Sequence, residues 1–286
     1  MTNNGGSNKK KLSIIPVSPR PFIKWVGGKT QLLPELAKRV PKDFARYYEP
    51  FIGGGALFFH LQPSKAILTD INPDLINLYI VVRDKVRELI EELKRHVYDK
   101  TYYYQMRNID RTSEYEGWSD VQRASRLIYL NKSCYNGLYR LNSQGQFNVP
   151  FGRYTDPTIL DVDNLLACHF VLQGSTVEVA DFGSIYEKIS SRDFVYFDPP
   201  YAPLSATSNF TSYTRHGFDI EMHYALKKLC LKLDAKGVRF MLSNSSAPLI
   251  LDLFADFNTE LVYATRAINS NAKKRGKIHE VVVTNY

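Results

Sequence analysis

Residues 47–70 read YYEPFIGGGALFFHLQPSKAILTD. An apolar strand pattern runs into three glycines and a helical pattern, and a second short apolar strand ends in Asp70. Glycines between a strand and a helix leave backbone N–H groups open to a ligand, and an acid after the next strand can bind ribose hydroxyls. The stretch predicts a site for a nucleoside-bearing cofactor, with a tight turn beside a surface aspartate as the alternative. It lacks G-x-G-x-x-G, which disfavours a dinucleotide and hence a dehydrogenase.

Strand and helix patterns alternate on both sides of a helical middle section. Asn72 before Pro73 predicts a helix opening. One apolar stripe then predicts a single long helix, with Leu75, Tyr79, Val82, Val86, Leu89, Leu93 and Val97 on it. From about residue 77 to 160 the pattern indicates helices and loops without a convincing strand.

The second half of the chain returns to alternation. The expected elements are a strand at 192–198, a helix at 219–236, a strand at 238–243, a helix after Ser246 and a last strand at 280–285. We therefore expect an α/β fold in which a helical insert interrupts the sheet domain.

The composition is that of an ordinary globular protein. Of 286 residues, 44% are apolar and 23% charged, which excludes a disordered or fibrous chain. No apolar run reaches the roughly 18 residues that a membrane span needs, and the polar start MTNNGGSNKKK does not resemble a signal peptide. We therefore expect a cytoplasmic protein without a membrane partner. The three cysteines, Cys134, Cys168 and Cys230, are too few and too widely spaced for a disulfide scaffold.

Basic residues gather in three segments without acidic residues, at 1–24, 121–155 and 266–277. A net charge of +8 favours a polyanionic partner, with scattered solubility charge as the alternative. In the middle segment cations alternate with aromatic residues, so that cations can contact phosphates and rings can contact exposed bases. The cations there are Arg123, Arg126, Lys132, Arg140 and Arg153, and the aromatic residues are Tyr129, Tyr135, Tyr139, Phe147, Phe151 and Tyr154. From the residues alone, half of these aromatic side chains are expected in the core.

The tetrapeptide Asp198-Pro199-Pro200-Tyr201 follows the apolar run FVYF. Its aspartate is therefore expected at the carboxyl end of a strand, where open α/β sheets bind ligands. The two prolines stiffen the loop. Such a loop suits a flat amine, because Asp198 and the Pro199 carbonyl accept its hydrogens while Tyr201 stacks on the ring. A plain proline turn is the alternative.

Methyl transfer to an adenine amine needs few other groups. Two acceptors that orient this weakly nucleophilic nitrogen would provide positioning and electrostatic stabilisation together. The six histidines show no metal-ligand spacing, so no metal is expected. None of the cysteines follows a proline, which disfavours methylation at a cytosine carbon.

Six blocks in this order resemble the Dam-type DNA adenine methyltransferases, which include the GATC-modifying enzymes of restriction–modification systems. The blocks are KWVGGK, EPFIGGGALFF, TDIN, YNGLYR, QFNVPFGRY and YFDPPYAPLS, and the similarity runs from Phe22 to Tyr286. The resemblance implies a Rossmann-like S-adenosylmethionine-dependent methyltransferase sheet with an inserted, mainly helical target-recognition domain. The expected division is a basic flexible tail at 1–20, a catalytic domain at 21–76 and 161–286, and the recognition domain at 77–160.

The resemblance also implies roles for individual residues. The cofactor S-adenosylmethionine would be bound by Trp25, Lys29, Glu49, Phe51, Gly53, Gly55, Asp70, Asp181, Phe182 and Asp198. The catalytic loop would be Asp198, Pro199, Pro200 and Tyr201. DNA would be contacted by Lys24, Tyr135, Asn136, Leu138, Arg140, Arg153 and Tyr154, with Tyr135 as a wedge in the duplex.

The expected activity is methylation of the exocyclic amine of a flipped adenine in double-stranded DNA, at GATC. The partners implied are double-stranded DNA and a restriction endonuclease that acts on the same sequence, and a monomer is expected. Two alternatives stay open. One is an amine methyltransferase acting on RNA or on a protein amide, which Asp198 and the basic insert disfavour. The other is a catalytically inactive DNA-binding homologue.

Overall fold

A computed structural model describes residues 17–202, 218–265 and 277–286. The first 16 residues of the basic tail, and Arg266, Lys273, Lys274 and Arg275 of the third basic segment, lie outside the described residues. The described strands form one sheet in the order β3-β2-β1-β4-β5-β7-β6. They are β1 (Tyr47–Glu49), β2 (Ala66–Asp70), β3 (Ser175–Val179), β4 (Phe194–Phe197), β5 (Arg239–Ser245), β6 (Asn258–Thr265) and β7 (Lys277–Thr284).

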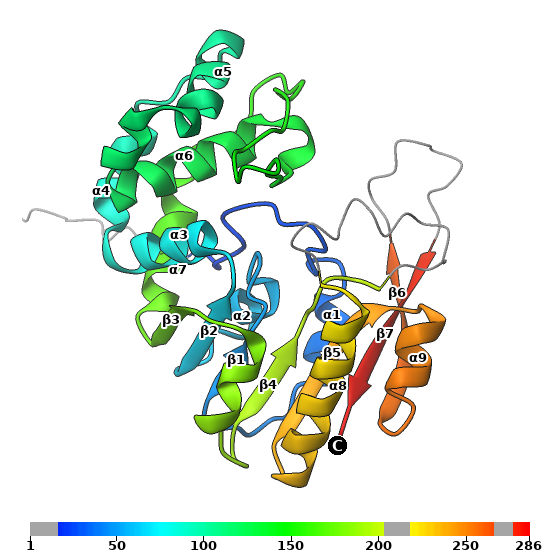
Figure 1. The fold of residues 1–286 in the computed structure, drawn as a ribbon. Helices are drawn as coiled ribbons and strands as arrows, with labels where there is room; N and C mark the ends of the chain where they lie inside the picture. Colours follow the sequence, from blue (N-terminus) through cyan, green and yellow to red (C-terminus); the bar gives the residue numbers. More distant parts are fainter. Residues whose placement is uncertain (1–16, 203–217, 266–276) are drawn as a thin grey trace, which may run out of the picture.

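Strand β7 runs antiparallel between β5 and β6, and the other neighbouring strands are parallel. Figure 1 shows the helical segments α4, α5 and α6 beyond the edge at which β4 ends. The helices are α1 (Leu33–Ala37), α2 (Ala56–Leu61), α3 (Pro73–Asp84), α4 (Val86–Leu93), α5 (Lys100–Asn108), α6 (Asp120–Ser133), α7 (Val162–Leu172), α8 (Ile220–Ala235) and α9 (Pro248–Leu253), with short 3₁₀ turns between some of them. Within the described ranges, none of these combines the length and apolar character that a membrane span requires. The expected α/β fold is confirmed.

Local signals in the sequence explain several element ends. Asn72 accepts hydrogen bonds from the backbone N–H groups of Asp74 and Leu75, and Pro73 occupies the first turn of α3. Helix α8 begins after the capping side chain of Asp219 and is followed by Gly237 at φ +71°. These predicted boundaries are confirmed.

The prediction of one long helix from Pro73 to Val97 is wrong. The chain leaves helical geometry at Lys85 (φ −133°, ψ 36°), and α4 starts immediately after it. The apolar stripe stays in phase across this break, so its spacing did not reveal a change in direction. Val97 lies beyond α4 and is 53% exposed.

Residues 77–160 are helical or irregular apart from two isolated bridges, Cys134–Phe151 and Leu141–Phe147, as expected. One apolar cluster belongs to this part alone: Tyr103, Tyr129, Leu130, Cys134, Phe147 and Val149. Helix α6, however, also packs into the cluster formed by α3, α7 and the sheet. The expected boundary after residue 76 falls inside α3, so we keep the division into catalytic and recognition domains as a proposal about function.

The buried His223 of α8 leads to a prediction on stability. Its side chain is 2% exposed, and neither ring nitrogen has a hydrogen-bond partner among the residues that the structure describes. Burial lowers its pKa to about 4. Because the unfolded chain binds this proton near pH 6.5 and the folded chain does not, stability is full above about pH 6.5 and falls as the pH drops towards 4. We expect His223→Phe to reduce that fall in urea unfolding between pH 7 and 4, and an unchanged pH dependence would contradict the assignment.

Candidate functional site

The candidate site lies where the strand order of the sheet reverses. Strand β1 pairs with β2 on one side and β4 on the other, so the loops that follow β1 and β4 leave neighbouring strands in opposite directions. Ligands of open α/β sheets bind at such a point, beyond the carboxyl ends of the strands. The glycine turn follows β1, Asp70 ends β2 and Asp198 follows β4. The structure therefore brings the predicted cofactor turn and the predicted catalytic loop to one edge.

The carboxylate of Asp198 is bound on one of its two oxygens. The Lys29 Nζ lies 2.6 Å from Oδ1, and the Ser243 hydroxyl donates to the same oxygen at 3.2 Å. Across the described ranges, no donor reaches Oδ2. The side chain is 20% exposed. Burial raises the pKa of Asp198, while the Lys29 ammonium and the Ser243 hydroxyl act in the opposite direction.

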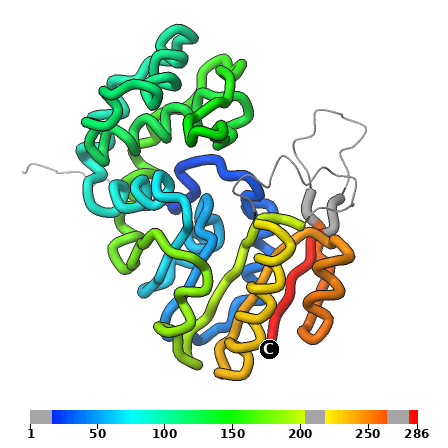
Figure 2. Tube along the Cα trace, in the orientation of Figure 1, coloured from blue at the N-terminus to red at the C-terminus, as the bar shows by residue number. Residues whose placement is uncertain are grey.

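Lys29 connects the catalytic loop to the segment before α1. Its side chain is 3% exposed, and its ammonium donates to the Gly27 carbonyl at 2.9 Å and to the Tyr201 hydroxyl at 2.8 Å. It also lies 4.4 Å from the centre of the Tyr201 ring and 4.0 Å from Glu280 Oε2. Figure 2 shows this N-terminal segment, in dark blue, passing between the helical part and the sheet. A buried cation thus joins Asp198 and Tyr201.

The glycine turn after β1 requires residues without side chains. Gly53 has φ +48° and Gly55 has φ +66°. A Cβ on Gly53 would lie 2.9 Å from Cδ1 of Trp25, and one on Gly55 would lie 2.6 Å from the Tyr79 hydroxyl. The Gly53 N–H donates to Asp70 at 3.4 Å, so the turn and the end of β2 are linked. Burial raises the pKa of Asp70.

The remaining residues that were predicted to bind the cofactor differ in how far they are exposed to solvent. Phe51 stacks on Phe182 with ring centres 5.4 Å apart. Asp181 is exposed and caps the following turn by accepting from the Gly183 N–H at 2.8 Å. Glu49 is 2% exposed and accepts from the Tyr47 hydroxyl at 2.7 Å. Burial raises the pKa of Glu49 well above the usual range, and its carboxyl group lies in the interior.

The predicted DNA-contacting residues gather around the end of α6. The Asn131 side chain accepts from the Lys24 N–H at 2.8 Å and donates to the carbonyls of Lys24 and Gly137. Lys24 Nζ lies 5.0 Å from the centre of the Tyr154 ring. Buried Asn131 thus holds the segment that carries Lys24 against the loop that carries Tyr135, whose own side chain is 50% exposed.

Asn136, Leu138, Arg140 and Arg153 complete this surface. Asn136 is exposed in left-handed geometry, and Leu138 is partly buried against the apolar cluster that includes Tyr103 and Tyr129. Arg140 and Arg153 are exposed, and Arg140 Nε donates to Asn148 Oδ1 at 2.7 Å. The ring of Tyr139 stacks on Trp25 at 5.1 Å, which joins this surface to the glycine turn.

Comparison with known proteins identifies the family. A profile of the D12 class N6 adenine-specific DNA methyltransferases matches residues 25–268. The chain belongs to this family. The resemblance to Dam-type enzymes is thereby confirmed, and the protein is an adenine-specific DNA methyltransferase.

Three relatives match this methyltransferase over nearly its whole length. The type II methyltransferase M1.LlaDCHI of Lactococcus lactis subsp. cremoris is 46% identical over 274 residues, which cover 94% of this chain and 96% of the relative. The type II methyltransferase M.MjaIII of Methanocaldococcus jannaschii is 41% identical over 287 residues, covering 93% and 99%. The DNA adenine methylase of Escherichia coli K12 is 34% identical over 269 residues, covering 92% and 94%.

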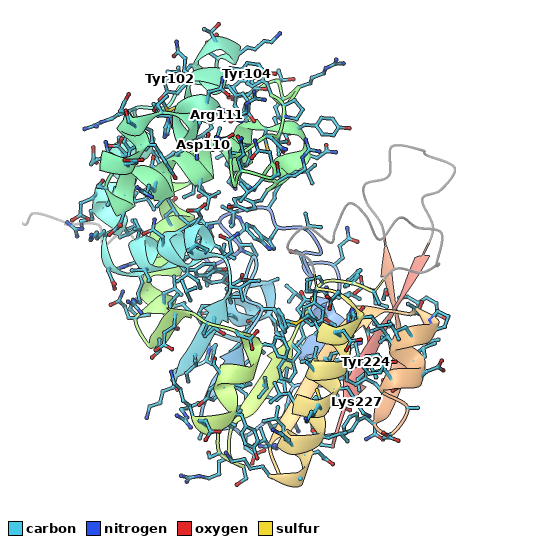
Figure 3. All side chains as sticks on the ribbon, viewed as in Figure 1. Tyr102, Tyr104, Asp110, Arg111, Tyr224 and Lys227 are labelled. Atoms are coloured by element: carbon cyan, nitrogen blue, oxygen red, sulfur yellow. The ribbon has the colours of Figure 1, made fainter. Side chains whose placement is uncertain are left out.

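Arg126 of the basic segment is buried and not available to phosphates, contrary to the sequence-based expectation, whereas Arg123 is partly exposed with its guanidinium bonded to backbone carbonyls. Arg126 is 7% exposed and pairs with Asp110 at 2.8 Å, and Arg123 donates to the carbonyls of Trp118 and Tyr115. Asp110 also accepts from the Phe147 N–H at 2.8 Å. Figure 3 labels Asp110 in the helical part of the methyltransferase. This buried pair fixes the chain that follows Arg140.

Half of the six aromatic side chains of this segment were expected in the core; two of the six are buried, three are partly buried and one is exposed. Tyr129 and Phe147 are buried in the apolar cluster that includes Tyr103, whereas Tyr135 is half exposed. No group of three potential metal-ligating side chains occurs in the portion that the structure describes. The partly buried His96 bonds to Tyr102 and Ser125.

Several residues that support the site were not predicted from the sequence. Ser243, Asn244 and Ser245 end β5 beside the catalytic loop, and Asn131 lies inside α6. Polar residues in a row at the end of an otherwise apolar strand, as in FMLSNSS, were a usable signal. No sequence signal indicated Asn131, because its contacts with Lys24 and Gly137 form only in the folded chain.

Proposed function

We propose that this methyltransferase rotates an adenine out of double-stranded DNA and methylates its exocyclic amine, with GATC as the target sequence. The observation that supports this most is the carboxylate of Asp198, whose Oδ1 is bound by Lys29 and Ser243 and whose Oδ2 receives no donor from the described residues. An exocyclic amine presents two N–H donors, and a carboxylate oxygen can accept one of them. The ring of Tyr201, 38% exposed, lies in the same loop and suits stacking on a base.

We infer S-adenosylmethionine as the methyl donor, because the chemistry of the site residues fits it. Asp70 offers a carboxylate at a strand end to ribose hydroxyls. We also assign Lys29 and Asp198, whose charged atoms lie 2.6 Å apart, to the cofactor site. Further contacts are assigned to Trp25, Phe51, Gly53, Gly55, Asp181 and Phe182, with buried Glu49 as support. When bound, the cofactor supplies an electrophilic methyl group on a sulfonium.

The residues of the catalytic loop compensate for the weak nucleophilicity of the amine. Its lone pair is delocalised into the adenine ring, so Asp198 Oδ2 and the Pro199 carbonyl are needed to bind the two hydrogens and direct the nitrogen. The nitrogen gains positive charge during transfer, and the fixed negative charge of Asp198 stabilises it. The raised pKa of the buried carboxylate also suits it to take up the proton that the nitrogen then loses.

The free-energy cost of extruding the base is offset by side chains that contact the base and by side chains that contact the duplex. Removing an adenine from the stack costs a few kcal/mol. Stacking on Tyr201 returns about 1–3 kcal/mol. We assign the half-exposed Tyr135 to the vacated position and the exposed Asn136 beside it to a phosphate. Lys24, Arg153 and Tyr154 are assigned to the outer guanine and the flanking backbone.

The target sequence is tested by expression in a host that lacks adenine methylation. Plasmid from these cells should resist an endonuclease that cuts only unmethylated GATC and should be cut by one that requires methylated GATC. Nucleoside mass spectrometry of the same DNA should detect N6-methyladenine. Methyladenine with full cutting at unmethylated GATC would reject the target sequence, and absence of methyladenine would reject the activity.

Arg140 is proposed to read a base edge, and its replacement should alter sequence preference. A bidentate arginine contact to guanine contributes about 1–3 kcal/mol of discrimination. Arg140→Ala should therefore narrow the difference in kcat/KM between GATC and singly altered duplexes by about tenfold or more, with a smaller effect on nonspecific binding. Equal loss on all duplexes would make Arg140 a phosphate contact. Arg87→Ala on the exposed surface of α4 is the control.

The cellular setting also follows from the proposed activity. We propose a monomeric enzyme that acts on chromosomal DNA in the cytoplasm. The names of the type II relatives favour pairing with a restriction endonuclease of the same target sequence.

A further inference from the structure

Ser243 has no part in the site as predicted from the sequence, yet it contacts the central carboxylate. It lies on β5, which pairs with β4 in a register that sets Phe197 opposite Leu242, so Ser243 is next to Asp198. The Ser243 side chain is completely buried, with its Oγ 3.2 Å from Asp198 Oδ1 and 2.7 Å from the Tyr196 hydroxyl.

The direction of these two hydrogen bonds follows from the number of protons. An ionised carboxylate can only accept, so the single hydroxyl proton of Ser243 is donated to Asp198. The oxygen of Ser243 then accepts from Tyr196, whose side chain is 1% exposed. The result is a buried chain from Tyr196 through Ser243 to Asp198, and each bond in such a chain polarises the next.

The next two residues of β5 hold the other end of the catalytic loop. Asn244 Oδ1 accepts from the Ala202 N–H at 3.1 Å, and the Ser245 hydroxyl donates to the Ala202 carbonyl at 2.7 Å. Both contacts go to the backbone. Within the described part of the loop, up to Ala202, Ser243 is therefore the one member of this tripeptide that bonds to a side chain.

We propose that Ser243, oriented by Tyr196, is a positioning residue for Asp198. With Lys29 it binds Oδ1 and so resists rotation of the carboxylate, which keeps Oδ2 directed to the incoming amine. Its hydrogen bond also favours the ionised carboxylate. The inference rests on the proposed role of Asp198 as acceptor of the adenine amine and adds the group that orients this acceptor.

The test compares Ser243→Ala with Ser243→Thr, which keeps the hydroxyl. Because a hydrogen bond to a charged group is lost, kcat of Ser243→Ala should fall about tenfold, with KM for DNA almost unchanged. The acid limb of the kcat–pH profile should move to higher pH, and Ser243→Thr should restore both quantities towards the wild-type values. Ser175→Ala, which removes the hydroxyl of a serine on β3 that is 7% exposed, is the matched control and should change neither.

Tyr196→Phe distinguishes positioning from packing. Because Tyr196 acts through Ser243, the double variant Ser243→Ala/Tyr196→Phe should be no slower than Ser243→Ala alone. Effects that multiply, or an unchanged acid limb in Ser243→Ala, would overturn the inference. If thermal unfolding shows that Ser243→Ala does not fold, the kcat–pH profile of Tyr196→Phe provides the test. A shift of its acid limb to higher pH would support the inference, and an unchanged acid limb would contradict it. A wild-type enzyme that methylates no adenine would reject the proposed function and this inference together, whereas unchanged variants of an active enzyme reject only the inference.

Discussion

Replacing Asp198 with alanine should lower the rate of methyl transfer by about 10³-fold at saturating cofactor, since a preorganised polar contact to the reacting group is lost. The measurement is single-turnover incorporation of a labelled methyl group into a GATC duplex, with thermal unfolding to confirm that the variant folds. Asp43→Ala is a matched control, because Asp43 lies on the surface and pairs only with Arg239 in the described structure. A variant that keeps more than about a tenth of the wild-type rate would contradict the role of Asp198.

Asp198→Asn is a stricter test of the same role, because asparagine and aspartate have nearly the same shape. Lys29 and Ser243 both donate to Oδ1, so the amide oxygen should turn to them. The amide NH₂ would then occupy the place of Oδ2 and present hydrogens to the hydrogens of the substrate amine. We expect this variant to be nearly as slow as Asp198→Ala, and a rate near that of the wild type would show that Oδ2 is not the acceptor.

Replacing Lys29 with methionine should slow the enzyme about 100-fold near neutral pH. Methionine keeps the buried stem but removes the charge that lies 2.6 Å from Asp198. Burial raises the pKa of Asp198 and the Lys29 ammonium opposes this, so the variant should hold Asp198 protonated to a higher pH. Because the ionised form accepts the amine, activity should recover as the pH rises, and the kcat–pH profile measures this.

Two controls separate this effect from others. Lys38→Met alters an exposed lysine that pairs with Glu35 and should keep the wild-type profile. Titration of Lys29→Met with S-adenosylmethionine, followed by calorimetry, reports any loss of cofactor affinity separately from the rate. A uniform loss of activity at all pH values would assign Lys29 to cofactor binding alone.

Local sequence patterns predicted the helices and strands whose conformation is determined by their own residues. The Asn72-Pro73 opening, the glycines after β1 and the strands before Asp198 and Asn285 were all readable. Strands β3 and β6 and helix α7 were not predicted. Their short amphipathic patterns resemble those of many loops, and these elements are stabilised by contacts with neighbouring strands. The break between α3 and α4 was invisible because a single non-helical residue leaves the apolar stripe in phase.

Site residues could be predicted where a sequence motif itself indicates the chemistry. They could not be predicted where the contact depends on how two strands pair. Asp198 and Tyr201 were identified from the tetrapeptide itself. Ser243 is an unremarkable serine in a strand until β5 pairs with β4, and the burial of Arg126 depends on Asp110, which is 16 residues away in the sequence. Charge patterns therefore overestimated the number of cations available to DNA.

The most direct test of the account is a crystal structure of the enzyme with a GATC duplex and a nonreactive cofactor analogue, in which the position of the target adenine is measured. We predict that the exocyclic nitrogen lies about 3 Å from Asp198 Oδ2, with Lys29 and Ser243 still on Oδ1 and the ring over Tyr201. An adenine bound elsewhere in the protein, or an amine bonded to Oδ1 after displacement of Ser243, would contradict the account.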